Sequence, residues 1–440
     1  MKENNPNTKT NFLNSMSFKL IILGILILLL LIPVSWIRSL INERQMRRTE
    51  AIAEVSSKWG REQTITGPVL SVPYHKEVKK FNADKKGYDY ITETRQLLLL
   101  PEDLTFNCEM IPEERYRGIY KVIVYKATAK ATGSFVKPDL KELEIAQSDI
   151  LWDKVSFSLK ISDFRSLQDE INLQYDEEIY SFTQGSMEGL SAGVKAGISL
   201  DSKKQEWSFN FNLDFNGSSV LSFQPLGKTT NVTVNSTWQD PSFTGSFLPD
   251  SRDISDDGFT ANWQILHLNR PIQQVYKNHT LLPINVANEF GVKLYSPVDH
   301  YQKSERSIKY AILFIALTFI AFFTLAVSNK VNIHPIQYIL IGLALSIFYS
   351  LLLSLSEHFG FDLAYWISSA SIIILLALYS KAIFKNMGLS VLLSGIILIL
   401  YGFIFTIIQM QDFALLVGSI GLFIVICILM YISLKLKSLN

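Results

Sequence analysis

Long uninterrupted runs of apolar residues lie near both ends of the chain. The first run, Leu20–Ile37, contains no charged residue, and about 18 such residues are enough to span a bilayer as a helix. The run is longer than the apolar core of a signal peptide, and no small-residue cleavage site follows it. We therefore expect an uncleaved transmembrane helix at residues 18–37, after a cytoplasmic tail at residues 1–17, rather than a removed signal peptide.

Five further apolar runs occupy the C-terminal part of the chain, and short connections separate them. They are Tyr310–Val327, Ile336–Leu355, Leu363–Ser380, Leu389–Ile408 and Phe413–Leu434. Each has the length of a membrane-spanning helix. The pattern predicts a five-helix transmembrane bundle over residues 309–440, and six spans in all would place both termini on the same side.

The basic residues of the short connections indicate the orientation in the membrane. Lysines lie in alternate connections and in the C-terminal tail: Lys330, Lys381, Lys385, Lys435 and Lys437. The intervening connections, Ser356–Asp362 and Gln409–Asp412, contain no Lys or Arg. Since cytoplasmic loops carry the excess of basic residues, we expect both termini in the cytoplasm and residues 38–308 on the opposite side. Basic residues beside that long segment, such as Arg44, count little in this rule.

The segment between the spans changes from helical spacing to a period of two. Val155–Ile161 and Trp207–Phe215 alternate apolar and polar residues, as strands with one buried face do. Asn216-Gly217 predicts a hairpin turn before Val220–Phe223. Further strands are expected at Ile119–Thr128 and Val232–Trp238. We predict a large, mainly antiparallel β domain, built as one sandwich or as a pair of β modules.

A short amphipathic helix is expected to continue out of the membrane between the first span and these strands. The residues near helical spacing are Ile41, Arg48, Ile52, Val55 and Trp59, and Gly60 is a typical stop. Its arginines suit contact with lipid phosphates, and a solvated connector helix explains the same pattern equally well.

Composition narrows the possible functions. The chain carries 41 basic and 40 acidic residues, a net charge of +1, so no overall field attracts nucleic acid. Cys108 and Cys427 lie in very different surroundings, which excludes a disulfide within the β domain and a cysteine zinc site. The sequence contains no P-loop, G-x-S-x-G, H-E-x-x-H or dinucleotide-binding motif. We therefore expect no cofactor, no metal and no enzymatic activity.

One polar cluster lies at the predicted outer end of the third span. Glu357 and His358 could act as an acid/base pair at the membrane surface, with Asp362 nearby. Adjacent residues on a helix point in different directions, however, and a polar helix end is the ordinary explanation. His334 begins the same helix roughly 36 Å away and cannot join them.

A seam of small residues follows one face of the same helix. Gly342, Ser346, Ser350 and Ser354 recur every four residues, which lets neighbouring helices approach closely. A polar permeation path is the alternative, but no span contains a charged residue or histidine in its interior. Ion-coupled transporters normally place such groups there, so we expect a packing seam.

An acidic turn in the β domain is a candidate partner-binding loop. Its aspartates are Asp250, Asp253, Asp256 and Asp257. Part of the turn imitates a calcium loop, but Gln264 stands where the bidentate Glu is required. We interpret it as a solvated turn, and loops between strands are where binding sites often lie.

Several segments resemble one family of membrane proteins. DHYQKSERSIKYAILFIALTFIAFF (Asp299–Phe323) and HPIQYILIGLALSIFYSLLLSLSEHFGF (His334–Phe361) closely resemble the CreD family. Shorter matching segments are IPVSWIRSLINER (Ile32–Arg44), TGPVLSVPY (Thr66–Tyr74), PSFTGSFLP (Pro241–Pro249) and DDGFTANWQ (Asp256–Gln264). These segments come from both ends and the middle, while Lys76–Lys228 matches by position and strand pattern. The resemblance implies a bacterial inner-membrane protein associated with cell-envelope integrity and stress response, with no catalytic residues to carry over.

Three functional hypotheses follow. The first is a non-enzymatic inner-membrane protein that supports envelope integrity, whose periplasmic domain (residues 38–308) binds a protein, lipid or glycan partner. Membrane lipids, an envelope protein or a cell-wall component are the expected partners, and nucleic acid is not. The second is a membrane-interface enzyme acting on a lipid or cell-wall precursor. The third, a small-solute transporter, is disfavoured by the uncharged interiors of the spans.

Overall fold

The computed structural model describes residues 16–82, 87–187, 190–277, 288–294, 300–410 and 413–437. Most of the predicted N-terminal tail and residues 411–412 lie outside this part of the chain. The chain forms two compact units. Met1–Thr49 and Val298–Asn440 make up the helical unit, and Glu50–Pro297 make up the β unit.

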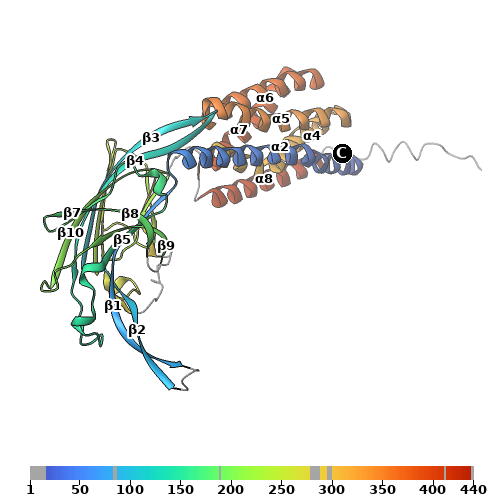
Figure 1. Ribbon diagram of the computed structural model, residues 1–440. Coiled ribbons are helices and arrows are strands. Elements are labelled where there is room, and N and C mark those ends of the chain that lie inside the picture. Colours follow the sequence, from blue (N-terminus) through green and yellow to red (C-terminus); the bar gives the residue numbers. More distant parts are fainter. Residues whose placement is uncertain are drawn as a thin grey trace, which may run out of the picture. The chain divides into compact units, whose positions relative to one another are not determined.

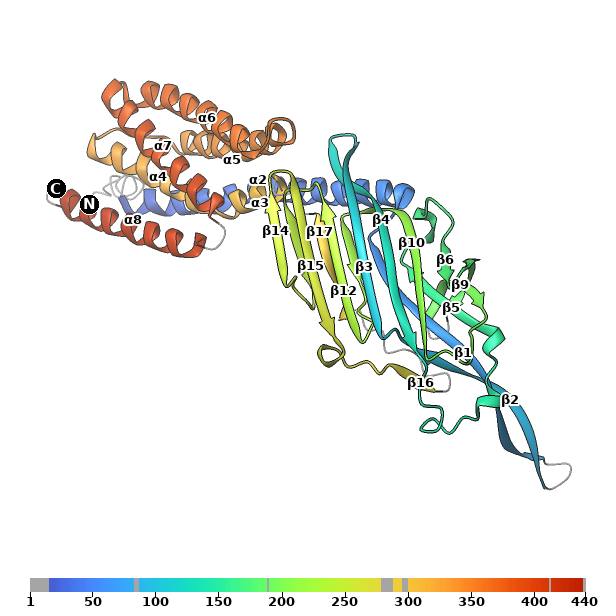
Figure 2. The ribbon, with the colours of Figure 1, turned by 90° about the vertical axis from the view of Figure 1, so that its left-hand side faces the viewer.

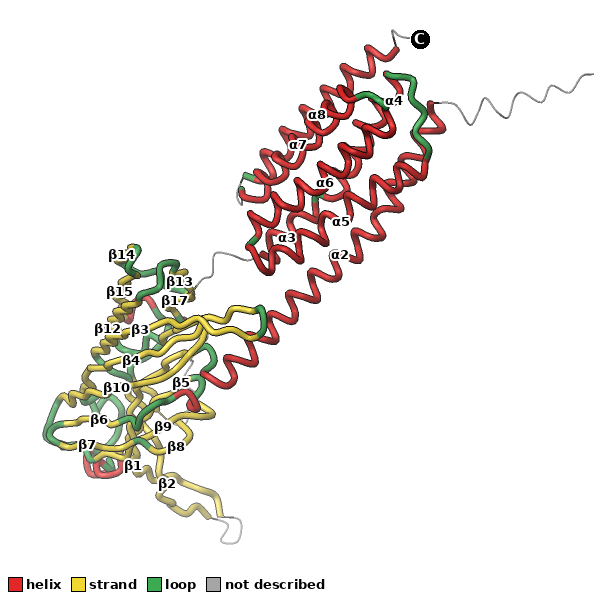
Figure 3. Tube along the Cα trace, turned by 90° about the horizontal axis from the view of Figure 1, so that it is seen from above, coloured by secondary structure: helices red, strands yellow, loops and turns green. Residues whose placement is uncertain are grey.

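The helical unit contains the six predicted spans, although the last turns of the first helix, from Glu50, belong to the β unit. They are α2 (Met16–Trp59), α4 (Ala311–Ser328), α5 (Pro335–Phe359), α6 (Phe361–Phe384), α7 (Met387–Gln409) and α8 (Ala414–Lys437). Across the described ranges, these six helices are long and apolar enough to cross a membrane, which confirms the predicted architecture. A short helix, α3 (His300–Lys309), precedes α4. Figure 3 shows the C-terminal helices packed side by side.

Local sequence signals explain where these helices begin and end. Pro335 occupies the first turn of α5, and the His334 side chain accepts a hydrogen bond from the Ile336 amide. Gly360, with a φ of 82°, separates α5 from α6, a backbone conformation that favours glycine. The Asn386 side chain caps the start of α7. The short connections therefore follow from ordinary capping chemistry.

Helix α2 continues past its apolar segment without a break. The residues predicted to form an amphipathic helix continuing out of the membrane are its last turns, which end at Trp59. Gly60 then stops it, as expected. A Cβ at Gly60 would lie 2.6 Å from the backbone oxygen of Asn216. Glycine is required there by a close approach of β-domain backbone.

The first sheet of the β unit contains nine described strands. Its main path runs β13 (Pro241–Gly245), β17 (Phe290–Leu294), β11 (Val220–Phe223), β1 (Gln63–Asn82), β5 (Val155–Ile161), β9 (Leu190–Ile198) and β8 (Thr183–Met187). On one side β2 (Gly87–Leu99) pairs with β1, and β16 (Val275–Lys277) pairs with β2. Figure 1 shows β1 and β2 running together as a long pair.

The second sheet contains eight described strands, most of which face the viewer in Figure 2. Their order is β14 (Ser251–Ser255), β15 (Gly258–Leu266), β12 (Thr229–Ser236), β3 (Asp103–Arg117), β4 (Tyr120–Val136), β10 (Glu206–Ser218), β6 (Asn172–Tyr175) and β7 (Glu178–Ser181). Among the described strands, pairing is antiparallel except between β1 and β11 and between β3 and β12. The prediction of a mainly antiparallel domain is confirmed.

One hydrophobic core joins the two sheets. Buried side chains from both sheets belong to a single cluster. Phe157 of β5, in the first sheet, meets Phe209 of β10, in the second, with ring centroids 5.2 Å apart. Of the two architectures left open by the sequence, the β unit is the sandwich.

The predicted hairpin at Asn216-Gly217 is wrong. Strand β10 continues through both residues and stays paired with β4 as far as Ser218. The chain turns at Ser219, with a φ of 60°, and enters the other sheet as β11. A Cβ at Gly217 would lie 2.2 Å from Cζ of Tyr125. This glycine serves close packing of a tyrosine ring against the strand and does not form a turn.

Candidate functional site

The predicted polar cluster of α5 and α6 is part of a wider network. We call Arg44, Tyr301, Lys303, Glu357, Asp362 and Gln409 the bundle-end network. The Tyr301 hydroxyl donates to Oε1 of Glu357 at 3.0 Å, and Nε of Arg44 lies 3.8 Å from the same oxygen. The Glu357 side chain is only 10% exposed. Its carboxylate is thus paired where burial would otherwise be costly.

Asp362 joins three helices in the same network. Nε2 of Gln409 donates to Oδ1 of Asp362 at 2.5 Å, and Nζ of Lys303 lies 3.4 Å from that oxygen. Lys303 also donates to Oε1 of Gln409 at 2.9 Å. These contacts connect α3, α6 and α7 at one end of the bundle.

His358 does not join Glu357 in an acid/base pair. Its side chain is exposed, and its ring lies beside Phe359. A different histidine has a defined role here, because Nδ1 of His300 accepts a hydrogen bond from the Phe361 amide at the start of α6. The sequence could not single out Tyr301, Lys303 and Gln409, which lie 47 to 106 residues from their partners. The geometry favours helix joining over proton transfer.

The small-residue seam divides into two halves. Gly342 lies against α2, since a Cβ there would be 2.0 Å from Cδ1 of Leu30. Ser346 is buried and donates to the Gly342 carbonyl at 3.0 Å. Ser350 and Ser354 are exposed. Among the described residues, close helix packing therefore involves the first half of the seam, Gly342 and Ser346.

The acidic turn is a tight β-hairpin. Ser255 pairs with Gly258, so Asp256 and Asp257 form the two-residue connection between β14 and β15. Asp253 lies within β14, opposite Thr260. Oδ2 of Asp250 accepts a hydrogen bond from the Gln264 amide at 2.6 Å. Within the described ranges, no group of three or more His, Cys, Asp or Glu side chains is arranged to hold a metal ion.

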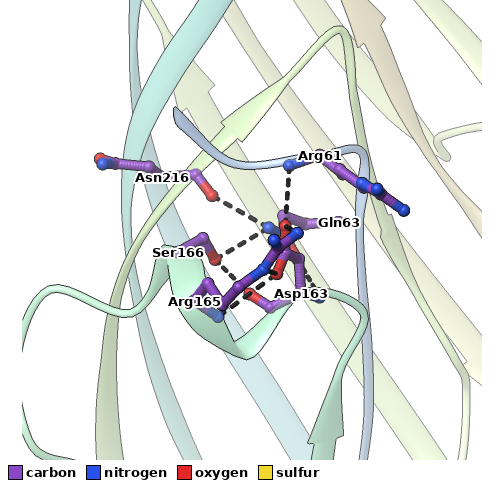
Figure 4. Close-up of polar contacts among 6 residues, drawn as sticks. All are labelled: Arg61, Gln63, Asp163, Arg165, Ser166 and Asn216. Atoms are coloured by element: carbon purple, nitrogen blue, oxygen red, sulfur yellow. Dashed lines mark hydrogen bonds and ion pairs between the residues drawn. The ribbon is translucent and has the colours of Figure 1, made fainter. Parts of the chain in front are cut away.

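A buried polar cluster at the junction of α2 and β1 has no signal in the sequence pattern (Figure 4). Gln63, the first residue of β1, is fully buried. Its Nε2 donates to Oγ of Ser166 at 2.9 Å and to the Asn216 carbonyl at 3.0 Å. Its Oε1 accepts from the Asp163 amide at 3.1 Å. One amide side chain thus connects three segments far apart in sequence.

Asp163 completes this cluster. Nε and Nη2 of Arg165 donate to its two carboxylate oxygens at 3.0 and 3.2 Å, and the Arg61 amide lies 3.5 Å from Oδ2. Burial raises the pKa of Asp163, but these hydrogen bonds outweigh it and hold the pKa below its ordinary value. We call Gln63, Asp163, Arg165 and Ser166, with the backbone of Arg61 and Asn216, the α2–β1 lock.

The β3–β4 hairpin makes a second connection to the last turns of α2. Nε1 of Trp59 donates to the Tyr125 carbonyl at 3.2 Å. The Arg115 guanidinium lies 3.6 Å from the centroid of the Trp59 ring, within cation–π range. Nε of Arg117 pairs with Glu54 at 2.9 Å. The end of α2 is thus tied to the second sheet of the β unit.

Comparison with known proteins agrees with the resemblance in the sequence. A family described as "Inner membrane protein CreD" matches residues 15–438. The chain belongs to the CreD family. The inner membrane protein CreD of Escherichia coli (strain K12) is 31% identical over 414 residues, which cover 92% of this chain and 90% of that protein. CreD membership, together with the six apolar helices, identifies a multi-pass protein of the inner membrane.

Proposed function

We propose that the protein is a non-enzymatic inner-membrane protein that supports envelope integrity by holding a partner-binding β domain at the membrane. In this proposal residues 38–308 are periplasmic and both termini are cytoplasmic. The observation that carries it is the continuity of α2, which runs from an apolar segment directly into the α2–β1 lock.

The chemistry of the lock supports a holding role. Its polar groups are buried and bonded to one another, and breaking such a set leaves desolvated groups without partners. The chain enters this bonded set directly after α2, and Trp59 of α2 itself donates a hydrogen bond to β4. This construction suits a domain that binds a partner close to the membrane.

Contacts within the helical unit support the proposed topology. Nζ of Lys19, at the start of α2, donates to Oδ1 of Asn332 in the connection between α4 and α5 at 2.9 Å. That connection carries Lys330, one of the lysines that indicate the cytoplasmic side. Arg44, further along α2, meets Glu357 at the end of α5. The contacts therefore agree with alternating sides for successive connections.

A complementation experiment tests this function. Cells lacking the gene would receive the full chain, a chain without residues 61–297, or the lock variant Gln63→Ala. Survival under detergent and cell-wall antibiotics would be measured at matched protein levels. We expect the full chain to restore survival and the shortened chain to fail. Full restoration by the chain without its β domain would refute the proposal.

Photo-crosslinking in cells would identify the kind of partner. A photoreactive residue at positions around Phe247–Phe259 examines the acidic hairpin, with Asp256 and Asp257 at its tip. A dominant protein adduct favours scaffolding, and a captured lipid or glycan favours surface binding. The same residue placed at Ser350, on a predicted span, serves as the matched control.

A further inference from the structure

Strands β1 and β2 extend beyond the sheet as a two-stranded arm. Strand β1 pairs with β5 only as far as Ser71, whereas its pairing with β2 continues to Asn82. We call residues 75–82 with 87–94 the β1–β2 arm. Figures 1 and 2 show it projecting from the body of the β unit.

One face of the arm carries exposed aromatic side chains. Phe81 lies opposite Tyr88 and Lys79 lies opposite Tyr90, so the strand register puts all four on the same face. Phe81, Tyr88 and Tyr90 are 59%, 60% and 70% exposed. The Phe81 and Tyr88 rings meet edge to face, and Nζ of Lys79 lies 4.5 Å from the Tyr88 centroid. Three large exposed rings on one face form a ready contact surface.

A polar groove lies at the root of the same arm. Its volume is about 350 Å³, and His75, Glu77 and Thr92 line it from the arm. The register puts these residues on the aromatic face, since Glu77 pairs with Thr92 and His75 with Thr94. Residues 143–149, which we call the facing segment, line the groove opposite the arm and contribute Glu144 and Asp149. The rings and the groove therefore form one continuous surface.

The facing segment is held in an unusual conformation. Tyr74 and Ile150 form an isolated bridge, and the Leu151 amide donates to the Pro73 carbonyl at 2.9 Å. Glu144 has a φ of 54°, which is uncommon for a residue other than glycine. Such residues often mark ligand sites. Among the described residues, neither the Glu77 nor the Glu144 carboxylate has a hydrogen bond or ion pair, so both are available to a ligand.

We infer that the β1–β2 arm and its groove bind a polysaccharide chain. Aromatic rings stack on the apolar faces of sugar rings, and carboxylates, imidazole and hydroxyl groups bond to sugar hydroxyls. From His75 to Phe81 the strand covers roughly 20 Å, which is enough for several sugar units. This inference rests on the proposed partner-binding role of the β domain and names the class of partner.

The charges of the groove favour a polysaccharide over an anionic lipid surface. Glu77, Glu144 and Asp149 line it together with Lys76 and Lys277, and this excess of carboxylates disfavours phosphate headgroups and nucleic acid. A hydroxyl-rich chain both donates and accepts hydrogen bonds, and so can satisfy carboxylates and lysines together.

Cosedimentation with an insoluble polysaccharide tests the inference. The full chain in nanodiscs of neutral lipid would be mixed with purified cell-wall sacculi, and the bound fraction measured against concentration. The triple variant Phe81→Ala/Tyr88→Ala/Tyr90→Ala should weaken apparent affinity roughly tenfold or more. Tyr116→Ala, which removes a 66% exposed ring from β3, is the matched control and should bind normally.

The groove is tested separately. Glu77→Gln/Glu144→Gln keeps size while removing charge, and should weaken binding severalfold, whereas Glu177→Gln on an exposed turn should not. Equal binding by all variants, or no binding by the full chain, overturns the inference. The inference is also overturned, in favour of a lipid partner, if the full chain binds anionic vesicles but not sacculi and the aromatic triple variant does not bind the vesicles.

Cell survival distinguishes this inference from the proposed function. If the arm variants fail to complement although the full chain binds no sacculi, the inference fails and the proposed function stands. If the variants lose sacculus binding yet complement fully, the polysaccharide site stands and its role in envelope integrity fails.

Discussion

The helical unit and the β unit place large apolar side chains in opposite environments. In the β unit, Phe211 and Trp207 are each 2% exposed. In the helical unit, Ile399 is 71% and Leu415 86% exposed. No residue of the apolar segment Ala414–Tyr431 in α8 is buried. The difference shows that the same apolar residue types serve in two environments, water around the β unit and lipid around the helices. Strands hide them from water, whereas spanning helices present them to lipid.

Polar groups follow the reverse arrangement. The β unit buries Gln63 and Asp163 in its interior, where their hydrogen bonds compensate for lost water. The helical unit gathers its described ion pairs at the bundle end, as with Glu357 and Lys303. Charges in a span centre are expensive, so polar connections are made where the helices end.

The largest difference between the two units is expected when one aromatic ring is removed from each. Phe211→Ala should lower the free energy of unfolding by about 3–5 kcal/mol, because it leaves a cavity in a packed core. Phe423→Ala, at a side chain 69% exposed on α8, should change it by less than about 0.5 kcal/mol. Denaturant unfolding in nanodiscs compares the two. Similar losses would contradict the contrast between the units.

Breaking the α2–β1 lock should have the next largest effect. Gln63→Ala removes three hydrogen bonds and leaves buried groups without partners, at a cost of about 2–3 kcal/mol. Gln205→Ala, at an exposed side chain, should be nearly neutral. Proteolysis between α2 and β1 supplies a local readout, and unchanged protection in Gln63→Ala would argue against the lock.

Acid should weaken the lock through Asp163. The folded pKa of Asp163 lies below its ordinary value, so its contribution is present above the unfolded pKa of about 3.9. That contribution is lost as the pH falls through the folded pKa. The melting temperature should therefore fall below about pH 4, and less steeply in Asp163→Asn. Parallel profiles for the two proteins would count against this role.

The smallest effect is expected at the bundle end. Glu357→Gln keeps an acceptor for Tyr301 but weakens the pairing with Arg44, and should cost about 1 kcal/mol or less. His358→Gln, at an exposed side chain, should cost nothing measurable. A chain with alanine at Glu357, His358 and Asp362 should still complement cells lacking the gene. Loss of complementation at normal protein levels would revive the enzyme hypothesis.

Local patterns predicted elements better than the connections between them. The alternation over Trp207–Phe215 correctly predicts a strand, because burial on one face sets a period of two. The Asn216-Gly217 pair led to the wrong prediction of a hairpin, because a glycine in a turn and a glycine needed beside the Tyr125 ring look alike in sequence. Glu357 and His358 adjoin in the chain, yet Glu357 pairs with Tyr301 and Arg44 instead. Long-range partners decide such sites.

The sequence by itself determined the number of spans, the β character of the central segment and the family. Each depends on a run or period of neighbouring residues, which is a local property. Only the tertiary structure decided the order of strands, the core shared by the two sheets, the α2–β1 lock and the aromatic face of the arm. Gln63 meets Ser166 and Asn216 across 103 and 153 residues. Such contacts form only when separate strands are packed together, and no local pattern encodes them.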